Sequence, residues 1–78
     1  MAREAVYLKA LNLAMSNQIK ISYSSGLAHL TLPSGYLYHG ATGLTLDVSG
    51  LTRLEAWQEI YKDVQELVDN KSQWEVAV

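Results

Sequence analysis

The chain has 78 residues, which is enough for one domain. Of these residues, 49% are hydrophobic and 18% are charged, a balance typical of a globular protein rather than a disordered one. The net charge of −2 argues against a nucleic-acid-binding protein, which normally has a basic surface. The absence of cysteine excludes disulfide-stapled scaffolds and thiolate metal sites.

The sequence also lacks membrane and targeting signals. No apolar run approaches 18 residues, so we expect no membrane span. The first residues, with Arg3 and Glu4, do not have the pattern of a secretory signal peptide. We therefore expect a cytoplasmic protein in which residues 1–78 form a single domain.

The first elements are predicted from the period at which apolar residues recur. Residues 3–17 follow a helical period, and their apolar face is wider than a single core requires. Such a helix is either deeply buried or covered on a second side by a partner. Apolar and polar residues then alternate in four short segments separated by turns, which predicts an antiparallel meander. These strands are predicted at residues 19–24, 27–32, 36–39 and 44–48.

The second helix has the clearest boundary in the sequence. Thr52 and Glu55 fit a capping box, and an apolar stripe at helical spacing continues to Val68 before Asn70 ends the helix. Residues 73–77 alternate again and predict a last strand. The order is therefore α-β-β-β-β-α-β. We expect an α+β domain in which two helices pack on one face of an antiparallel sheet.

Part of this order, a helix, a hairpin and a second helix, resembles two known families. They are the double-stranded-RNA-binding domain and the small head–tail joining proteins of tailed phages. The first would require basic residues at the start of the second helix, where residues 52–59 hold one arginine and two glutamates. The second matches only in the order of elements, with residues 33–46 as an insertion. We therefore assign no family from the sequence.

The most unusual feature is a run of 26 residues, 21–46, without a charged side chain. Fourteen of them are Ser, Thr, Gly or Tyr, which are the residues that antibody-like binding surfaces use. Interface cores are also poor in charge, whereas exposed edge strands usually carry it. Two interpretations stay open: a sheet that is mostly core, or a surface for a partner or a second copy. The residues predicted for such a surface are Tyr23, His29, Tyr36, Tyr38 and His39.

A second candidate surface is the acidic side of the second helix. Residues 51–78 hold six acidic and three basic side chains, so the negative charge is concentrated there. This side could bind a basic protein surface; the alternative is an ordinary solvated helix face. Its predicted residues are Glu55, Glu59, Asp63 and Glu66.

We expect no catalysis, no cofactor and no metal. His29, His39 and Asp47 are suitable metal ligands, but strand register decides whether they meet. We expect locally hydrogen-bonded histidines instead. No serine lies in a G-x-S-x-G elbow, and residues 40–43 lack the lysine of a phosphate-binding loop.

The sequence therefore predicts a non-enzymatic protein-binding module, such as a phage-type inhibitor that occludes or bridges a protein partner. One alternative is a homo-oligomeric small-ligand-binding or sequestering protein, with a pocket between subunits. Another is a small structural component of a particle. The expected partner is a protein or a second copy, in a homodimer or higher oligomer, and neither nucleic acid nor a membrane is expected. The ligand pocket of the first alternative would be lined by His29, Tyr36, Tyr38 and His39.

Overall fold

The computed structural model describes residues 5–77, so positions 3 and 4 of the predicted first helix lie outside the described residues. The helices are α1 (Val6–Ser16), α2 (Arg53–Asp69) and the short 3-10 helix η1 (Lys71–Gln73). The strands are β1 (Lys20–Ser24), β2 (Leu27–Thr31), β3 (Tyr36–Leu37), β4 (Gly43–Asp47) and β5 (Glu75–Val76). The predicted α+β class and order of elements are confirmed.

The strands form two antiparallel sheets. The main sheet has the order β1-β2-β4, and β3 pairs with β5 in a separate two-stranded sheet. The predicted four-strand meander is therefore wrong in one respect, because β4 rather than β3 lies beside β2. The cause is the turn after β2, where the Tyr36 N–H donates to the Pro33 carbonyl at 3.2 Å and Gly35 has a φ of 92°. This turn directs β3 away from the main sheet.

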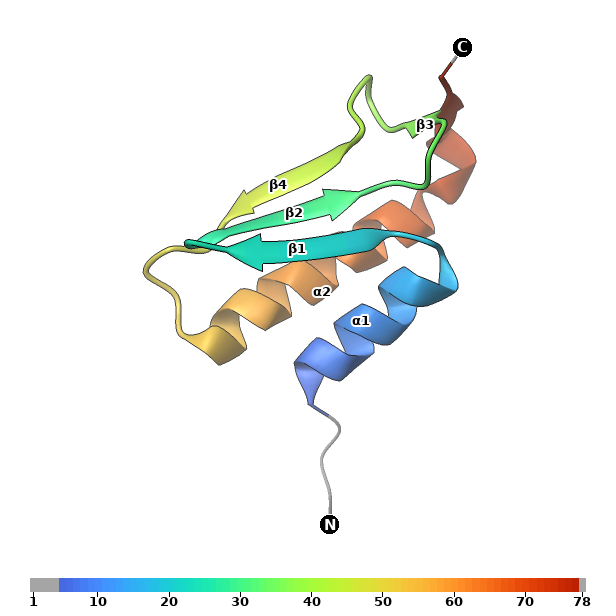
Figure 1. Cartoon of the computed structure of the whole chain (residues 1–78). Coiled ribbons are helices and arrows are strands. Elements are labelled where there is room, and N and C mark those ends of the chain that lie inside the picture. Colours follow the sequence, from blue (N-terminus) through green and yellow to red (C-terminus); the bar gives the residue numbers. More distant parts are fainter. Residues whose placement is uncertain (1–4, 78) are drawn as a thin grey trace.

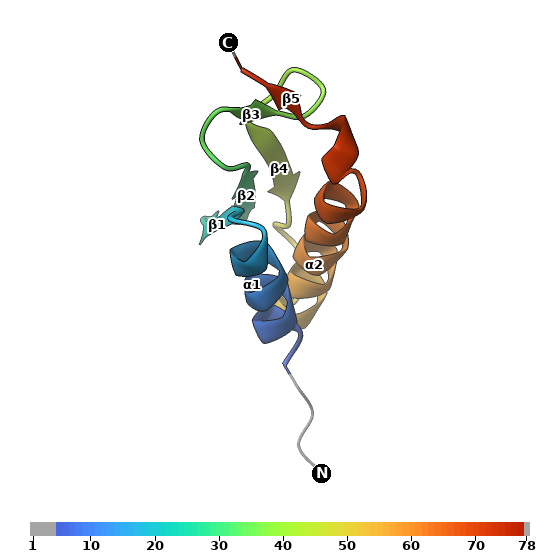
Figure 2. The same ribbon diagram turned by 90° about the vertical axis from the view of Figure 1, so that its right-hand side faces the viewer.

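Both long helices cover the same face of the main sheet, as predicted (Figure 1). In Figure 2, α1 lies below β1, and α2 lies below the other side of the sheet. The side chains of Ala28 and Leu30 on β2 are buried toward the helices, while their neighbours in sequence are exposed on the opposite face. No other described element covers that opposite face. The largest fully buried side chains are Leu30, Ile60, Val64 and Leu67.

Hydrogen bonds fix the ends of both long helices. The predicted capping box of α2 is confirmed, with Thr52 Oγ1 accepting from the Glu55 N–H at 3.2 Å and Glu55 Oε1 accepting from the Thr52 N–H at 2.9 Å. At the end of α1 the Ile19 N–H donates to the Ala14 carbonyl at 2.8 Å, and Gln18 has a φ of 59°. These features form a Schellman motif, which turns the chain from α1 into β1. Within residues 5–77, no helix is both long enough and apolar enough to span a bilayer.

Candidate functional site

The three tyrosines predicted for partner binding lie in three different places. Tyr38 is only 5% exposed and belongs to the hydrophobic core, so the structure places it out of reach of a partner. Tyr36 lies on β3, with its ring 5.9 Å from the ring of Trp74. Tyr23 lies on β1, 5.7 Å from the ring of Trp57. The structure therefore does not bring these residues together.

The two histidines are also apart. His29 lies on the exposed face of β2, where its Nδ1 is hydrogen-bonded to Thr45 Oγ1 at 3.2 Å. His39 lies in the turn between β3 and β4, with its ring 4.2 Å from that of Tyr38. Among residues 5–77, no group of three His, Asp or Glu side chains is arranged to hold a metal ion.

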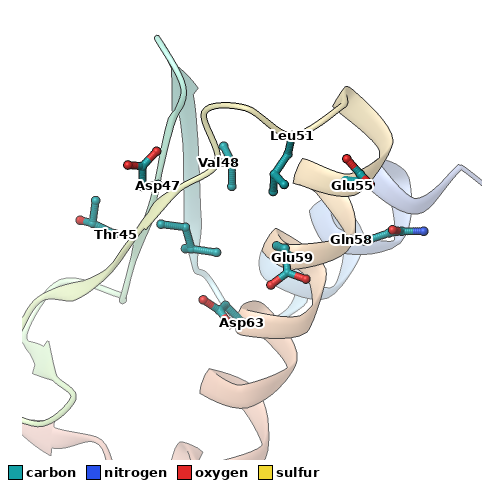
Figure 3. A pocket seen from close by; sticks show the side chains of 9 residues that line it. Thr45, Asp47, Val48, Leu51, Glu55, Gln58, Glu59 and Asp63 are labelled. Carbon is teal, nitrogen blue, oxygen red and sulfur yellow. The ribbon is translucent and has the colours of Figure 1, made fainter.

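The acidic side of α2 lines a groove beside the main sheet (Figure 3). The groove has a volume of about 650 Å³ and lies between β4 and α2. Glu55, Glu59 and Asp63 line it, while the fourth predicted acidic residue, Glu66, does not. Asp47 on β4 also borders the groove, with its carboxylate pointing away from α2 (Figure 3). Its place at this groove depends on the strand order β1-β2-β4, which local sequence patterns do not give. The remaining lining residues are Thr45, Leu46, Val48, Leu51 and Gln58.

The surroundings of Asp63 and Asp47 shift the pKa values of their carboxyl groups in opposite directions. Burial, followed by repulsion from Glu66 and Glu59, raises the pKa of Asp63 above 3.8. Hydrogen bonds from the Ser49 hydroxyl at 2.6 Å and the Ser49 N–H at 3.0 Å lower the pKa of Asp47. Within residues 5–77, no basic side chain lines the groove. The groove is therefore electronegative at neutral pH.

We expect Asp63→Asn to raise the midpoint of thermal unfolding near pH 7 but to change it little near pH 3. A carboxyl group whose pKa is raised by folding binds its proton more tightly in the folded state, so stability falls as the pH rises through that pKa. The amide cannot ionise and removes this loss. Circular dichroism melts across this pH range measure the effect, with Asp69→Asn as the exposed control. An equal gain at every pH would contradict the prediction.

A second exposed surface is the apolar side of α1. Leu8, Leu11 and Met15 recur at helical spacing, so they lie on one side of the helix. This side lies between the buried side, marked by Ala10 and Ala14, and the polar stripe of the helix. Leu8 is 42% exposed, Met15 is 73% exposed and Leu11 is half-buried. The core therefore covers only part of the wide apolar face predicted for this helix.

Helix α1 lies beside a strand with a free edge. In the main sheet β1 pairs only with β2, so its other edge has no partner among the described residues. Both β1 and α1 lie on the same outer side of the domain (Figure 2). The side chain of Ile21 is half-buried toward the core, and Tyr23 is 39% exposed. Together with α1, they give this side of the domain a largely apolar surface.

A smaller pocket of about 390 Å³ lies where the end of α1 meets η1. Its walls include Tyr36 and Trp74, and Lys71 Nζ lies 5.6 Å from the centre of the Trp74 ring. Lys71 Nζ also donates to Asn17 Oδ1 at 3.2 Å. Of the four residues predicted to line a ligand pocket, only Tyr36 lines this one.

The described residues thus present two unlike surfaces, one at each edge of the main sheet. The surface beside β1 is apolar, and the groove beside β4 is acidic. Sequence periodicity predicted the acidic side of α2 and the wide apolar face of α1, but not which strand lies beside each. In comparisons with known proteins, no family model, no curated protein and no solved structure matches the chain.

Proposed function

We propose that the chain is a non-enzymatic protein-binding module and that the apolar side of α1 is its principal contact surface. The observation that carries this proposal is the exposure of Leu8 and Met15 next to the half-buried Leu11. Contiguous apolar side chains outside a core mark interaction sites in water-soluble domains. Methionine suits such a site because its flexible thioether adapts to the shape of a partner.

The neighbouring edge of β1 supports the same use. Lys20 is the only charged residue of the strand, so a partner can approach this edge without desolvating many charges. A bound protein would cover the apolar side of α1 and the unpaired main-chain groups of β1 at once. An inhibitor that occludes its target is one protein that would act in this way.

Site-specific photo-crosslinking tests the proposal in cells of the organism that encodes the chain. We expect a benzophenone amino acid at Met15 to give one adduct of defined mass. The matched control carries the probe at Asn12, on the exposed polar side of the same helix. An adduct of twice the chain mass identifies a second copy, and a larger one identifies a different protein. Absence of an adduct, or equal adducts from both positions, would overturn the proposal.

The second candidate function is the binding of a small ligand in the pocket beside Trp74. The observation that favours it is the combination of two aromatic walls, Tyr36 and Trp74, with the ammonium group of Lys71. An aromatic anion could stack on the rings and pair with the lysine. Native mass spectrometry of the purified chain tests this candidate. A co-purified mass that Tyr36→Ala removes would favour it, and its absence would count against it.

A further inference from the structure

The outer edge of β4 has no partner strand among the described residues, so its main-chain groups are free to face the acidic groove. Two hydrogen bonds fix which residues face β2: Leu32 N–H to the Thr42 carbonyl at 2.9 Å, and Val48 N–H to the Gly26 carbonyl at 2.8 Å. In an antiparallel pair, successive residues point their N–H and C=O groups alternately toward the partner strand and away from it. The groups of Gly43, Thr45 and Asp47 therefore point to the free edge.

We propose that this edge binds an extended, lysine- or arginine-bearing segment of a partner protein as an added strand of the main sheet. The site is separate from the apolar side of α1, so this inference goes beyond the proposed function and does not depend on it. Strand addition to a free edge is an established mode of peptide recognition, in which main-chain hydrogen bonds give affinity and neighbouring pockets select side chains. Here the groove of about 650 Å³ between β4 and α2 is the neighbouring pocket.

The spacing of the acids matches the spacing of side chains on a strand. Glu55, Glu59 and Asp63 follow each other at four-residue intervals on α2. At a rise of about 1.5 Å per residue, adjacent acids lie about 6 Å apart along the helix. Alternate residues of a strand lie about 6.7 Å apart. Because α2 and β4 run alongside each other (Figure 1), alternate side chains of the added strand would each meet one acid.

The charge of the groove selects a basic occupant. Three carboxylates of α2 line it, from Glu55, Glu59 and Asp63, and no lysine or arginine among residues 5–77 does. Glu59 and Asp63 extend from α2 toward the space beside β4 (Figure 3). A cationic segment would also relieve the mutual repulsion that contributes to the raised pKa of Asp63.

The same charge disfavours two other occupants. A second copy that paired through β4 would place two acidic sides of α2 next to each other, which costs free energy. Nucleic acid would bring its phosphates against the same carboxylates. The other free edge, β1, has no acidic residue and borders apolar side chains, so it does not favour a basic segment.

The test uses three synthetic peptides of seven residues and the full chain. The probe has lysine at positions 2, 4 and 6 and valine or threonine elsewhere. The second peptide has the same composition but three consecutive lysines. The third has the probe sequence with N-methyl groups on alternate residues, which keep the charge but block strand pairing. Heteronuclear NMR reports affinity and the exchange protection of each amide.

We expect the probe to bind and to protect the N–H groups of Gly43, Thr45 and Asp47 from exchange. The N-methylated peptide and the consecutive-lysine peptide should each bind at least tenfold more weakly. Glu59→Lys should weaken binding of the probe at least tenfold, whereas the control Asp69→Lys, an exposed position of the same helix outside the groove, should change it much less.

Four results would overturn the inference. They are no binding of the probe, equal binding of the N-methylated peptide, no effect of Glu59→Lys, and protection at Ile21 and Tyr23 on β1 instead of on β4.

Thr45→Pro gives an independent check, because proline removes an outward N–H and is tolerated at such edge positions. Its control is Thr45→Ala, and a circular dichroism melt verifies folding of both. Loss of binding only in the proline variant is expected, and retained binding in a folded proline variant would also overturn the inference. None of these results bears on crosslinking from Met15, so the two proposals can fail separately.

Discussion

Leu30→Ala is expected to lower the free energy of unfolding by about 2–5 kcal/mol, the range for leucine-to-alanine changes in a packed core. Leu30 is 1% exposed and lies on β2, the central strand of the main sheet, facing both helices. A domain of this length has roughly 4–12 kcal/mol of total stability. The change should therefore remove a large fraction of the stability of the domain. Urea denaturation followed by tryptophan fluorescence measures the change.

Leu27→Ala is the matched control for this prediction. Leu27 lies on the same strand and undergoes the same change, but it is 39% exposed on the opposite face. We expect it to cost clearly less, about 1 kcal/mol, because more than a third of the side chain stays in water and its truncation leaves no enclosed cavity. If both variants lost the same stability, the core would not lie on the helix side of β2. Because β2 joins both edge strands, Leu30→Ala should also weaken binding at both proposed surfaces.

The sequence was sufficient for the elements whose signals are local. The capping box at Thr52 and Glu55 predicted the start of α2, and alternation of apolar and polar residues predicted β1, β2 and β4. The sequence did not predict that β3 pairs with β5. Each of these strands has two residues, and Tyr36 pairs with Val76, forty positions later. Neither length nor spacing specifies such a contact.

The burial of Tyr38 shows the same limit. Tyr36 and Tyr38 have the same parity, so a continuous strand would place both on one face. In the structure β3 ends at Leu37, and the chain reverses at His39, which has a φ of 51°. Tyr36 is therefore 41% exposed while Tyr38 is 5% exposed. Because this short strand ends in a tight turn, the alternation of side chains does not continue through Tyr38. Alternation therefore does not predict which of the two side chains is buried.

For the candidate surfaces, the sequence predicted the composition but not the surroundings. Helical period alone places Glu55, Glu59 and Asp63 on one side of α2. The strand order places this side of α2 beside the free edge of β4. The strand order itself depends on contacts between segments that are distant in the sequence. In the folded chain, the side chains of the uncharged run 21–46 fall into two groups. Some of its side chains, such as Leu30, are core, and others, such as His29, lie on the face that no described element covers.

Gly43→Ala is expected to lower the free energy of unfolding by about 1–3 kcal/mol, the usual cost of forcing extra atoms into a packed site. A Cβ on Gly43 would fall onto the carbonyl oxygen of Leu30 and would lie 2.8 Å from its carbonyl carbon and 3.0 Å from the Cα of Thr31. These are main-chain atoms of β2, so no change of rotamer relieves the clash, and β4 must move away from β2.

Thr45→Ala, an exposed change on the same strand, is the control and should stay within about 0.5 kcal/mol. Urea denaturation gives the loss of stability, and amide exchange at Leu44 and Leu46 shows whether the β2–β4 hydrogen bonds loosen. Unchanged stability with unchanged protection would mean that β4 does not pack against β2 as closely as the structure shows. In that case β4 would not form one side of the acidic groove as described.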